Sequence, residues 1–316
     1  MKPKVLFLDS THPILYEKLK ELGFEILHEF DKTKEELIPQ LKDIEGLIIR
    51  SRMKIDAEIM QHSPSLKFIG RVGSGLENID LEYAKSKGIF CINSPEGNRD
   101  AVAEHTLGML LCLKNNILKS DKEVRNGFWL REENRGIEIS GKTIAIIGFG
   151  NMGSAFAQRL KGFDCTILAY DKYKTNYAPD YVKETTLEDV FENADIVSYH
   201  IPYNPENHYL INTNHINLFK KTITILNTSR GKILNTQDLV AALKSGKVNG
   251  ACLDVLEYES VNLQNLEKDQ WPEAMTQLAM MQNVVLSSHI AGWTQESNIK
   301  LSLFLIEKIK KVLQLQ

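Results

Sequence analysis

Short apolar runs alternate with amphipathic segments over the first 95 residues. Runs typical of buried parallel strands occur at 5–8, 24–27, 47–49, 67–70 and 89–92. Helix signals between them are a helix opened by Pro13, a capping box of Thr33 and Glu36, and a helix after Asp56. Such alternation predicts an α/β fold with a parallel sheet and helices on its faces.

The pattern changes near Ser94-Pro95, where one long helix is predicted over residues 100–125. A second alternating set follows, with strands at 143–147, 165–169, 196–199, 222–226, 249–253 and 284–286 and helices starting near Asn151, Leu187, Asn214 and Asn235. An amphipathic helix over 295–313 closes the chain. We therefore expect two doubly wound domains, the first (1–95 and 291–316) split by insertion of the second (96–290).

Composition and charge narrow the function classes. The 316 residues are 43% hydrophobic and 25% charged, as in a globular protein, and the net charge of −3 gives no basic excess for binding nucleic acid. No apolar run approaches the roughly eighteen residues of a membrane span, and the run at 5–8 is too short for a signal peptide. Cys91, Cys112, Cys165 and Cys252 are scattered without a CxxC pair, so we expect reduced core thiols in a cytoplasmic protein and no metal site.

A glycine turn follows the strand predicted at 143–147. Gly148-Phe149-Gly150-Asn151-Met152-Gly153 reads GxGxxG between a strand and a helix, the context in which the motif binds a dinucleotide. The glycines permit a tight turn, a close approach of the backbone to a pyrophosphate and close packing of helix on strand. The N–H groups and dipole of the helix N-terminus would then face the phosphates.

An acidic residue at the end of the next strand strengthens this interpretation. Asp171 lies about twenty residues after the turn, where a carboxylate accepts hydrogen bonds from the ribose hydroxyls of NAD and repels the extra phosphate of NADP. Lys172 and Lys174 nearby weaken that exclusion slightly. The sequence therefore predicts NAD as the cofactor.

Three polar residues follow later strands of the same predicted sheet. Arg230 comes after the strand at 222–226, Glu259 after the strand at 249–253, and His289 after the strand at 284–286. A hydroxy-acid dehydrogenase needs a base, a group that orients the base and a cation for the substrate carboxylate. Each residue taken alone is typical of a surface or packing role, but together they suit this chemistry.

The motifs resemble those of the D-isomer-specific 2-hydroxyacid dehydrogenases over nearly the whole chain. The matching stretches are 70–80, 93–111, 141–171, 194–202, 226–231, 250–255 and 288–296. The resemblance implies two Rossmann-like domains, a flavodoxin-like substrate-binding domain (1–95 and 291–316) and an NAD-binding domain (96–290). Within the family, the motifs are most similar to those of enzymes that oxidise D-3-phosphoglycerate to 3-phosphohydroxypyruvate in serine biosynthesis.

The resemblance also implies a role for each matching residue. His289 would be the general acid/base, Glu259 would fix its tautomer and stabilise its charged form, and Arg230 would bind the substrate carboxylate. The other expected contacts are Asp254 with the nicotinamide carboxamide, Thr228 with the cofactor, His200 and Pro202 with the adenosine side, and the loop Val72-Gly73-Ser74-Gly75 with the substrate carboxylate.

A phosphorylated substrate needs further cations. The resemblance places Arg50, with Ser51 beside it, and Arg71 at the substrate, and it places Arg131 on a segment that reaches the partner subunit's site. Three arginines suit a phosphate dianion, although surface arginines paired with acids such as Glu132 are the alternative. The segment 100–130 would form a homodimer contact. Because the chain ends at Gln316, soon after the last helix, a C-terminal regulatory domain is not expected.

Two other interpretations stay open. A glyoxylate or hydroxypyruvate reductase would use the same residues without a phosphate clamp. An NAD(H)-sensing corepressor would keep the fold and use it as a binding module. His105, in the helical segment, lacks metal-ligand spacing and is expected to have a core or interface role, and the segment 260–283 could be a lid or a crossover.

Overall fold

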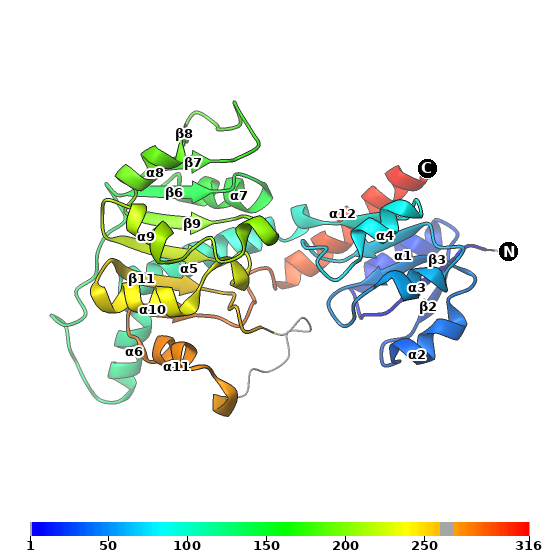
Figure 1. The fold of residues 1–316 in the computed structure, drawn as a ribbon, viewed down its shortest axis with the longest axis horizontal. Coiled ribbons are helices and arrows are strands. Elements are labelled where there is room, and N and C mark those ends of the chain that lie inside the picture. Colours follow the sequence, from blue (N-terminus) through cyan, green and yellow to red (C-terminus); the bar gives the residue numbers. More distant parts are fainter. Residues whose placement is uncertain (1, 260–267, 316) are drawn as a thin grey trace. The chain divides into compact units, whose positions relative to one another are not determined.

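The computed structural model describes residues 2–259 and 268–315. The described chain divides into two compact units, one up to Arg99 and from Trp293 onward, the other from Asp100 to Gly292. The boundaries expected from the sequence were 95/96 and 290/291. Each unit carries its own sheet (Figure 1).

Unit 1 is built on a parallel sheet with the strand order β2-β1-β3-β4-β5. Its strands are β1 (Lys4–Phe7), β2 (Glu25–His28), β3 (Ile44–Ile49), β4 (Phe68–Arg71) and β5 (Phe90–Asn93), and its helices are α1 (Pro13–Glu21), α2 (Lys34–Leu37), α3 (Ala57–Gln61), α4 (Leu81–Ser86) and α12 (Gln295–Leu313). Successive side chains of a strand point to opposite faces, so Val5 packs with α1 and α12 while Leu6 packs with the cluster on the other face. The capping box of Thr33 and Glu36 is confirmed.

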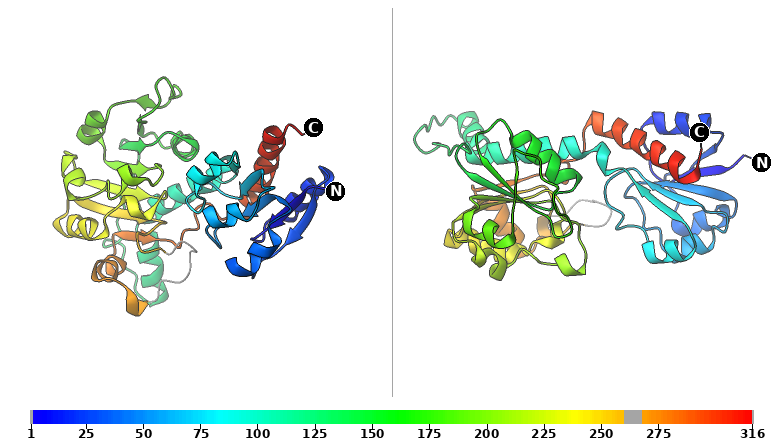
Figure 2. Two further views of the ribbon diagram at one scale, coloured as in Figure 1. Left: turned by 45° about the vertical axis from the view of Figure 1, so that its right-hand side comes forward. Right: turned by 90° about the horizontal axis from the view of Figure 1, so that it is seen from above.

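Unit 2 has a parallel sheet with the strand order β12-β11-β10-β9-β6-β7-β8. The strands are β6 (Thr143–Ile147), β7 (Thr166–Tyr170), β8 (Lys183–Glu184), β9 (Ile196–Tyr199), β10 (Ile223–Asn227), β11 (Val248–Leu253) and β12 (Val284–Leu286). The helices are α5 (Arg99–Lys114), α6 (Ile117–Arg125), α7 (Asn151–Leu160), α8 (Leu187–Asn193), α9 (Thr213–Leu218), α10 (Thr236–Ser245) and α11 (Glu273–Met280). They cover both faces of the sheet (Figure 2), and Ala145 and Ile146 of β6 accordingly belong to different core clusters.

The continuous helix predicted over 100–125 is wrong. The chain leaves the helix after Lys114 and starts α6 at Ile117, because Asn116 adopts a left-handed conformation with φ of 52°. Asparagine tolerates this conformation better than most residues. The freed Lys114 carbonyl accepts a hydrogen bond from the Ile137 backbone at 2.9 Å. Apolar spacing alone does not report such a break.

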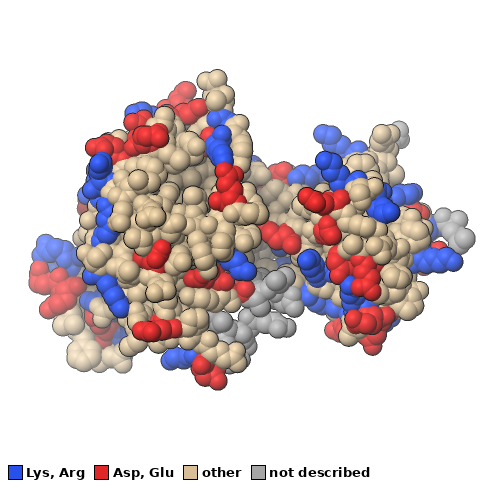
Figure 3. Space-filling view, in the orientation of Figure 1, with Lys and Arg blue, Asp and Glu red and all other residues tan. Residues whose placement is uncertain are grey.

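The fold class expected from the sequence, two parallel α/β domains with the first split by the second, is confirmed. All four cysteines are free, and no described helix has the length and apolar content needed to cross a membrane. On the face shown in Figure 3, acidic and basic side chains are interspersed over both units. Of the segment 260–283, residues 260–267 lie outside the described part, and 273–280 form α11.

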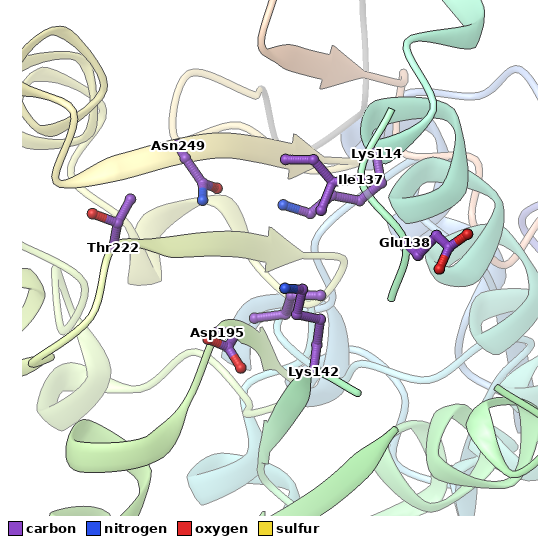
Figure 4. A pocket seen from close by; sticks show the side chains of 8 residues that line it. Lys114, Ile137, Glu138, Lys142, Asp195, Thr222 and Asn249 are labelled. Atoms are coloured by element: carbon purple, nitrogen blue, oxygen red, sulfur yellow. The ribbon is translucent and has the colours of Figure 1, made fainter. Parts of the chain in front are cut away.

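A cavity of about 130 Å³ lies at the amino ends of several strands of unit 2 (Figure 4). Lys142, Asp195 and Thr222 line it just before β6, β9 and β10. Lys114 reaches Thr224 with its Nζ atom at 2.6 Å, and burial lowers the pKa of this amine. The glycine turn follows the carboxyl end of β6, so the cavity lies at the opposite edge of the sheet from the expected dinucleotide site.

Candidate active site

The glycine turn has the close contacts that the motif requires. Gly148 has φ of 92°, and a Cβ atom there would lie 2.5 Å from the His200 carbonyl oxygen. At Gly153 a Cβ atom would lie 2.1 Å from the Gly148 carbonyl oxygen, whereas at Gly150 it would meet no described atom within 4 Å. Close backbone packing thus requires a glycine at 148 and at 153, whereas Gly150 leaves room for a ligand beside the backbone.

The helix after this turn begins without a side-chain cap. Asn151 and Met152 open α7. The N-cap residue is Gly150, which has no side chain that could accept from the first N–H groups of the helix. Uncapped N–H groups at the start of a ten-residue helix suit a pyrophosphate. Phe149, within the turn, is buried, and its ring packs on the ring of Tyr177. These residues therefore fit a dinucleotide.

Asp171 is tied to the same turn. One carboxylate oxygen accepts from the Phe149 backbone at 2.9 Å and the other from the Tyr173 backbone at 3.0 Å. Lys172 pairs with Glu206, and Lys174 donates to the Phe149 carbonyl at 2.7 Å, so both lysines are engaged. Each carboxylate oxygen has a second lone pair with which it can accept from a ribose hydroxyl.

His200 follows β9 and braces the turn from the neighbouring strand. Its backbone donates to the Ile147 carbonyl at 2.8 Å, its Nε2 lies 2.8 Å from the Ser198 hydroxyl, and its ring packs on Phe156 of α7. Burial lowers the pKa of this imidazole to about 4, so the ring is neutral near neutral pH. Pro202 is exposed two residues on. Their contact with the adenosine stays a prediction.

His289 and Glu259 come together as the sequence predicts. The His289 Nδ1 atom lies 2.8 Å from Glu259 Oε2, and the other carboxylate oxygen accepts from the Leu256 backbone at 2.5 Å. The carboxylate accepts a hydrogen bond from Nδ1–H, so in a neutral His289 ring Nε2 carries no proton and can act as a base. The two side chains are 32% and 25% exposed, so the pair can reach a small substrate.

Asp254 holds the loop that carries His289. It is 1% exposed, and its carboxylate accepts from the backbones of Ile290 and Ala291 at 2.8 and 2.9 Å. Its own carbonyl accepts from the His289 backbone at 2.8 Å. Asp254 therefore fixes the loop of residues 289–291 through these hydrogen bonds. Its expected contact with the nicotinamide carboxamide stays a prediction.

Arg230 lies in a tight turn after β10. Asn227 accepts from the Ser229 backbone at 3.1 Å and donates to the Arg230 carbonyl at 3.0 Å, which closes the turn. A Cβ atom at Gly231 would lie 2.0 Å from the Leu256 carbonyl oxygen, so this turn packs directly on the segment that leads to Glu259. Thr228 bonds to Thr106 of α5, hydroxyl to hydroxyl, at 3.0 Å.

The candidate substrate residues of unit 1 follow two adjacent strands. Arg50 and Ser51 come after β3, and Arg71 ends β4; the Val72 backbone donates to the Ile49 carbonyl at 2.9 Å across the pair. Arg71 crosses Gly73, where a Cβ atom would lie 1.7 Å from its Nη1 atom. Beyond Gly73, the Ser74 hydroxyl donates to the Asn98 side chain at 2.7 Å, and Gly75 follows.

Arg50 stacks on an aromatic residue that the sequence did not single out. Its guanidinium lies 4.1 Å from the ring centroid of Trp293, and burial lowers its pKa although Asp9 raises it. Arg131 is exposed in unit 2, on the segment between α6 and β6, and thus belongs to a different unit from Arg50 and Arg71.

A second polar link in unit 2 was also missed. His105 of α5 and Ser287 after β12 lie 2.9 Å apart, Nε2 to Oγ, although 182 positions separate them in the chain. The sequence favoured a core or interface role for His105, and the structure adds a polar partner two residues before His289. No local pattern reports a contact between two elements so distant in sequence.

The chain is similar in sequence to known dehydrogenases. The model of the D-isomer specific 2-hydroxyacid dehydrogenase NAD binding domain matches residues 107–291. D-3-phosphoglycerate dehydrogenase from Methanocaldococcus jannaschii is 33% identical over 98% of this chain and 57% of the relative, so the chain spans about half the length of such relatives. Glyoxylate reductase from Thermofilum pendens is 36% identical over 90% of this chain and 84% of its own.

A solved structure shows the same architecture. D-lactate dehydrogenase from Aquifex aeolicus, complexed with NAD and lactic acid, aligns with a TM-score of 0.82 and 28% identity over 98% of this chain and 95% of that one. The family model covers more than half of the chain and the archaeal relative nearly all of it. The chain belongs to the D-isomer specific 2-hydroxyacid dehydrogenase family.

Proposed function

We propose that the protein is an NAD-dependent dehydrogenase that oxidises D-3-phosphoglycerate to 3-phosphohydroxypyruvate. The observation that carries the proposal is the pair of His289 and Glu259, 2.8 Å apart, at the same edge of the sheet as the glycine turn and Asp171. The carboxyl ends of the strands are where doubly wound sheets bind ligands. A base and a dinucleotide turn at one edge are the two parts that a hydride-transfer site requires.

In this proposal the bound nicotinamide supplies the hydride acceptor. His289 takes the proton of the substrate hydroxyl at Nε2, and the Glu259 carboxylate stabilises the imidazolium that forms. Arg230 binds the substrate carboxylate and polarises the oxygen at C2. Asp254 keeps the His289 loop in place through its bonds to Ile290 and Ala291.

Asp171 supports NAD rather than NADP as the cofactor. Its carboxylate is fixed by two backbone N–H groups, at 2.9 and 3.0 Å, and would repel a 2′-phosphate. Lys172 pairs with Glu206, and Lys174 donates to the Phe149 carbonyl and lies 4.0 Å from the Asp171 carboxylate, so these lysines weaken the repulsion only in part.

The phosphorylated substrate is the finer part of the proposal. Arg50 and Arg71 follow adjacent strands of unit 1, and two guanidinium groups suit the two charges of a phosphate monoester. The relative from Methanocaldococcus jannaschii carries the corresponding name. The second candidate is a glyoxylate reductase, favoured by the relative from Thermofilum pendens, of which this chain covers 84%.

We also propose a homodimer formed through the region of α6 and the segment after it. Large apolar side chains are exposed there: Ile117, Leu118, Val124, Phe128, Trp129, Leu130 and Ile137. A cluster of this kind is more typical of a protein interface than of a surface in contact with water. Arg131 lies within it and would be carried to the partner.

The test is a substrate panel that follows NADH formation by absorbance. D-3-phosphoglycerate with NAD should give the highest kcat/KM among hydroxy acids, and NADP should react more slowly. Faster reduction of glyoxylate or hydroxypyruvate would favour the second candidate. If no 2-hydroxy acid or 2-keto acid turned over, the proposed activity would be wrong.

Replacement of Arg50 tests the phosphate clamp. Arg50→Ala should raise the KM for D-3-phosphoglycerate about tenfold or more, while the KM for hydroxypyruvate, which lacks the phosphate, changes little. Arg52→Ala is the control for the loss of a neighbouring arginine whose guanidinium is used within unit 1, where it donates to the carbonyls of Leu8 and Lys32 at 2.8 Å each. This variant should change the KM values for the two substrates by the same factor. Equal changes for both substrates in Arg50→Ala would argue against a phosphate contact.

A further inference from the structure

His105 of α5 lies behind the loop that carries His289. Its Nε2 atom is 2.9 Å from the Ser287 hydroxyl and 3.5 Å from Asp254 Oδ1, and its side chain is 24% exposed. Ser287 lies two residues before His289 in the same loop. His105 therefore contacts the structure that positions the proposed base without being part of it.

The proton of the Ser287 hydroxyl determines which of the two groups, His105 or Ser287, donates in this hydrogen bond. The Ser287 hydroxyl lies 2.6 Å from Asp254 Oδ1, and an ionised carboxylate has no proton to give, so the hydroxyl proton points to Asp254. The longer approach of the same hydroxyl to the Met109 sulfur, 3.6 Å, does not compete. The remaining hydrogen bond must then run from the Nε2–H of His105 to the Ser287 oxygen.

This donor begins a continuous chain to the catalytic loop. His105 donates to Ser287, Ser287 donates to Asp254, and the Asp254 carboxylate accepts from the backbones of Ile290 and Ala291. Without the imidazole, the Ser287 hydroxyl would lose the hydrogen bond that it accepts, and Asp254 would lose the ring nitrogen that lies 3.5 Å from its Oδ1 atom. The Asp254 carboxylate is 1% exposed, so a change in the Ser287 hydroxyl that donates to it is not offset by water.

The loop also needs such support because of its backbone. His289 has φ of 57°, a left-handed conformation that persists in a residue with a side chain only when its surroundings hold it. The Asp254 carbonyl and carboxylate together accept three hydrogen bonds from the backbones of residues 289–291. A shift of the Asp254 carboxylate would therefore change the direction of the His289 ring.

We propose that His105 is a positioning residue, whose hydrogen bond to Ser287 sets the Asp254 carboxylate and thereby the direction of the His289 imidazole. The proposal rests on the proposed role of His289 as the base. The alternative is a histidine that only fills space between α5 and β12, and a side chain of similar size without an Nε2 donor would then replace it without loss.

Two variants separate these roles. His105→Leu keeps most of the volume and removes the donor, whereas the amide of His105→Gln can place an N–H near the position of Nε2. We expect kcat of His105→Leu to fall about tenfold to a hundredfold, with the KM for NAD and for substrate within about twofold of the parent. His105→Gln should recover most of the lost kcat. A kcat of His105→Leu within twofold of the parent, or a folded His105→Gln as slow as His105→Leu, would overturn the proposal.

Hydrogen exchange of the protein without substrate gives a readout that does not depend on turnover. In His105→Leu the backbone amides of residues 287–291 should exchange about tenfold faster, while those of β11 stay as in the parent. His62→Leu is the matched control, because His62 is exposed in unit 1 and its Nδ1 atom contacts only the Glu58 carbonyl of its own helix in the structure. Unchanged exchange of the loop in His105→Leu would contradict the proposal.

The proposed function and this inference fail in different ways. If His289→Ala kept the parent kcat, the role of His289 would be wrong, and the loop exchange alone would decide whether His105 holds the loop. If His289→Ala were inactive while His105→Leu retained the parent kcat, only the role of His105 would be wrong.

Discussion

His289 adopts a backbone conformation that most side chains avoid, with φ of 57°. Histidine is one of the residue types that occur there more often than others, and the penalty of about 1 kcal/mol is offset by the hydrogen bonds from residues 289–291 to Asp254. Held in this way, the ring presents Nδ1 to Glu259 and keeps Nε2 for chemistry. The strain is located at the residue that we assign as the base.

His289→Ala removes the proposed base without touching the glycine turn. We expect kcat to fall about a hundredfold to ten-thousandfold, since proton transfer by a positioned side chain contributes that much, while the Kd for NADH stays within about twofold. Turnover by absorbance and NADH binding by fluorescence titration check the two halves separately. A loss of NADH binding as large as the loss of kcat would point to a structural defect instead.

Gly231 tests how closely two turns must pack. A Cβ atom there would lie 2.0 Å from the Leu256 carbonyl oxygen, a backbone atom that moves only with the segment leading to Glu259. Gly231→Ala should therefore lower kcat/KM about a hundredfold by displacing Arg230 or Glu259, with the protein still folded. Gly162→Ala, where no described atom lies within 4 Å, is the control and should leave kcat/KM unchanged. Equal rates for both variants would contradict the packing argument.

At the scale of the elements, local sequence signals predicted where helices begin better than where a helix is interrupted. The capping box of Thr33 and Glu36 and the glycine turn before α7 are written in a few adjacent residues, and both are present in the structure. The break between α5 and α6 depends on one left-handed residue, Asn116, and on the Ile137 backbone that bonds to the end of α5. Apolar spacing continues through such a break, so it favoured one continuous helix.

In the candidate site too, residues marked by a local pattern could be predicted, whereas contacts between elements distant in the sequence could not. Arg230, Glu259 and His289 could be found because each comes after a strand, and strand ends of a parallel sheet converge at one edge. The bond from His105 to Ser287 joins α5 to the end of β12, and the stack of Arg50 on Trp293 joins β3 to the approach to α12. Their geometry depends on how elements pack, which periodicity does not contain.

The end of β7 should decide the choice between NAD and NADP. Asp171→Asn keeps an acceptor for the Phe149 or Tyr173 backbone and removes the charge that repels a 2′-phosphate. The ratio of kcat/KM for NAD to that for NADP should fall about tenfold or more. Asp180→Asn, an exposed carboxylate nearby in the chain, should leave the ratio as in the parent. A ratio unchanged in Asp171→Asn would remove the carboxylate from cofactor selection.

For the whole molecule, charge is nearly balanced, with 38 basic against 41 acidic side chains. The two signs are also mixed on the visible face of each unit (Figure 3), so mutual repulsion of surface charges is small near neutral pH. Sensitivity to moderate acid must then come from individual buried groups. Unit 2 holds two such groups, His200 and His215, each with a pKa lowered to about 4 by burial.

These two histidines predict the pH range over which stability is lost. In the unfolded chain an imidazole takes up a proton near its ordinary pKa of about 6.5, whereas in the folded chain it stays neutral until about pH 4. The unfolded state therefore binds more protons in this range, and the free energy of unfolding falls as the pH falls from about 6.5 toward 4. By about pH 5 each histidine should have lowered it by up to about 2 kcal/mol.

His215→Gln isolates one of the two contributions at a distance from the proposed cofactor turn. The glutamine amide can keep the contact that His215 Nε2 makes with the Tyr199 hydroxyl at 2.8 Å, but it does not titrate. Urea unfolding at about pH 7 and about pH 5 should show a smaller loss of stability on acidification in His215→Gln than in the parent, even if the variant is less stable at both pH values. His208→Gln, at an exposed position, should lose as much stability as the parent. The same loss in His215→Gln as in the parent would show that His215 is protonated in the folded protein, and that water or a carboxylate reaches its ring.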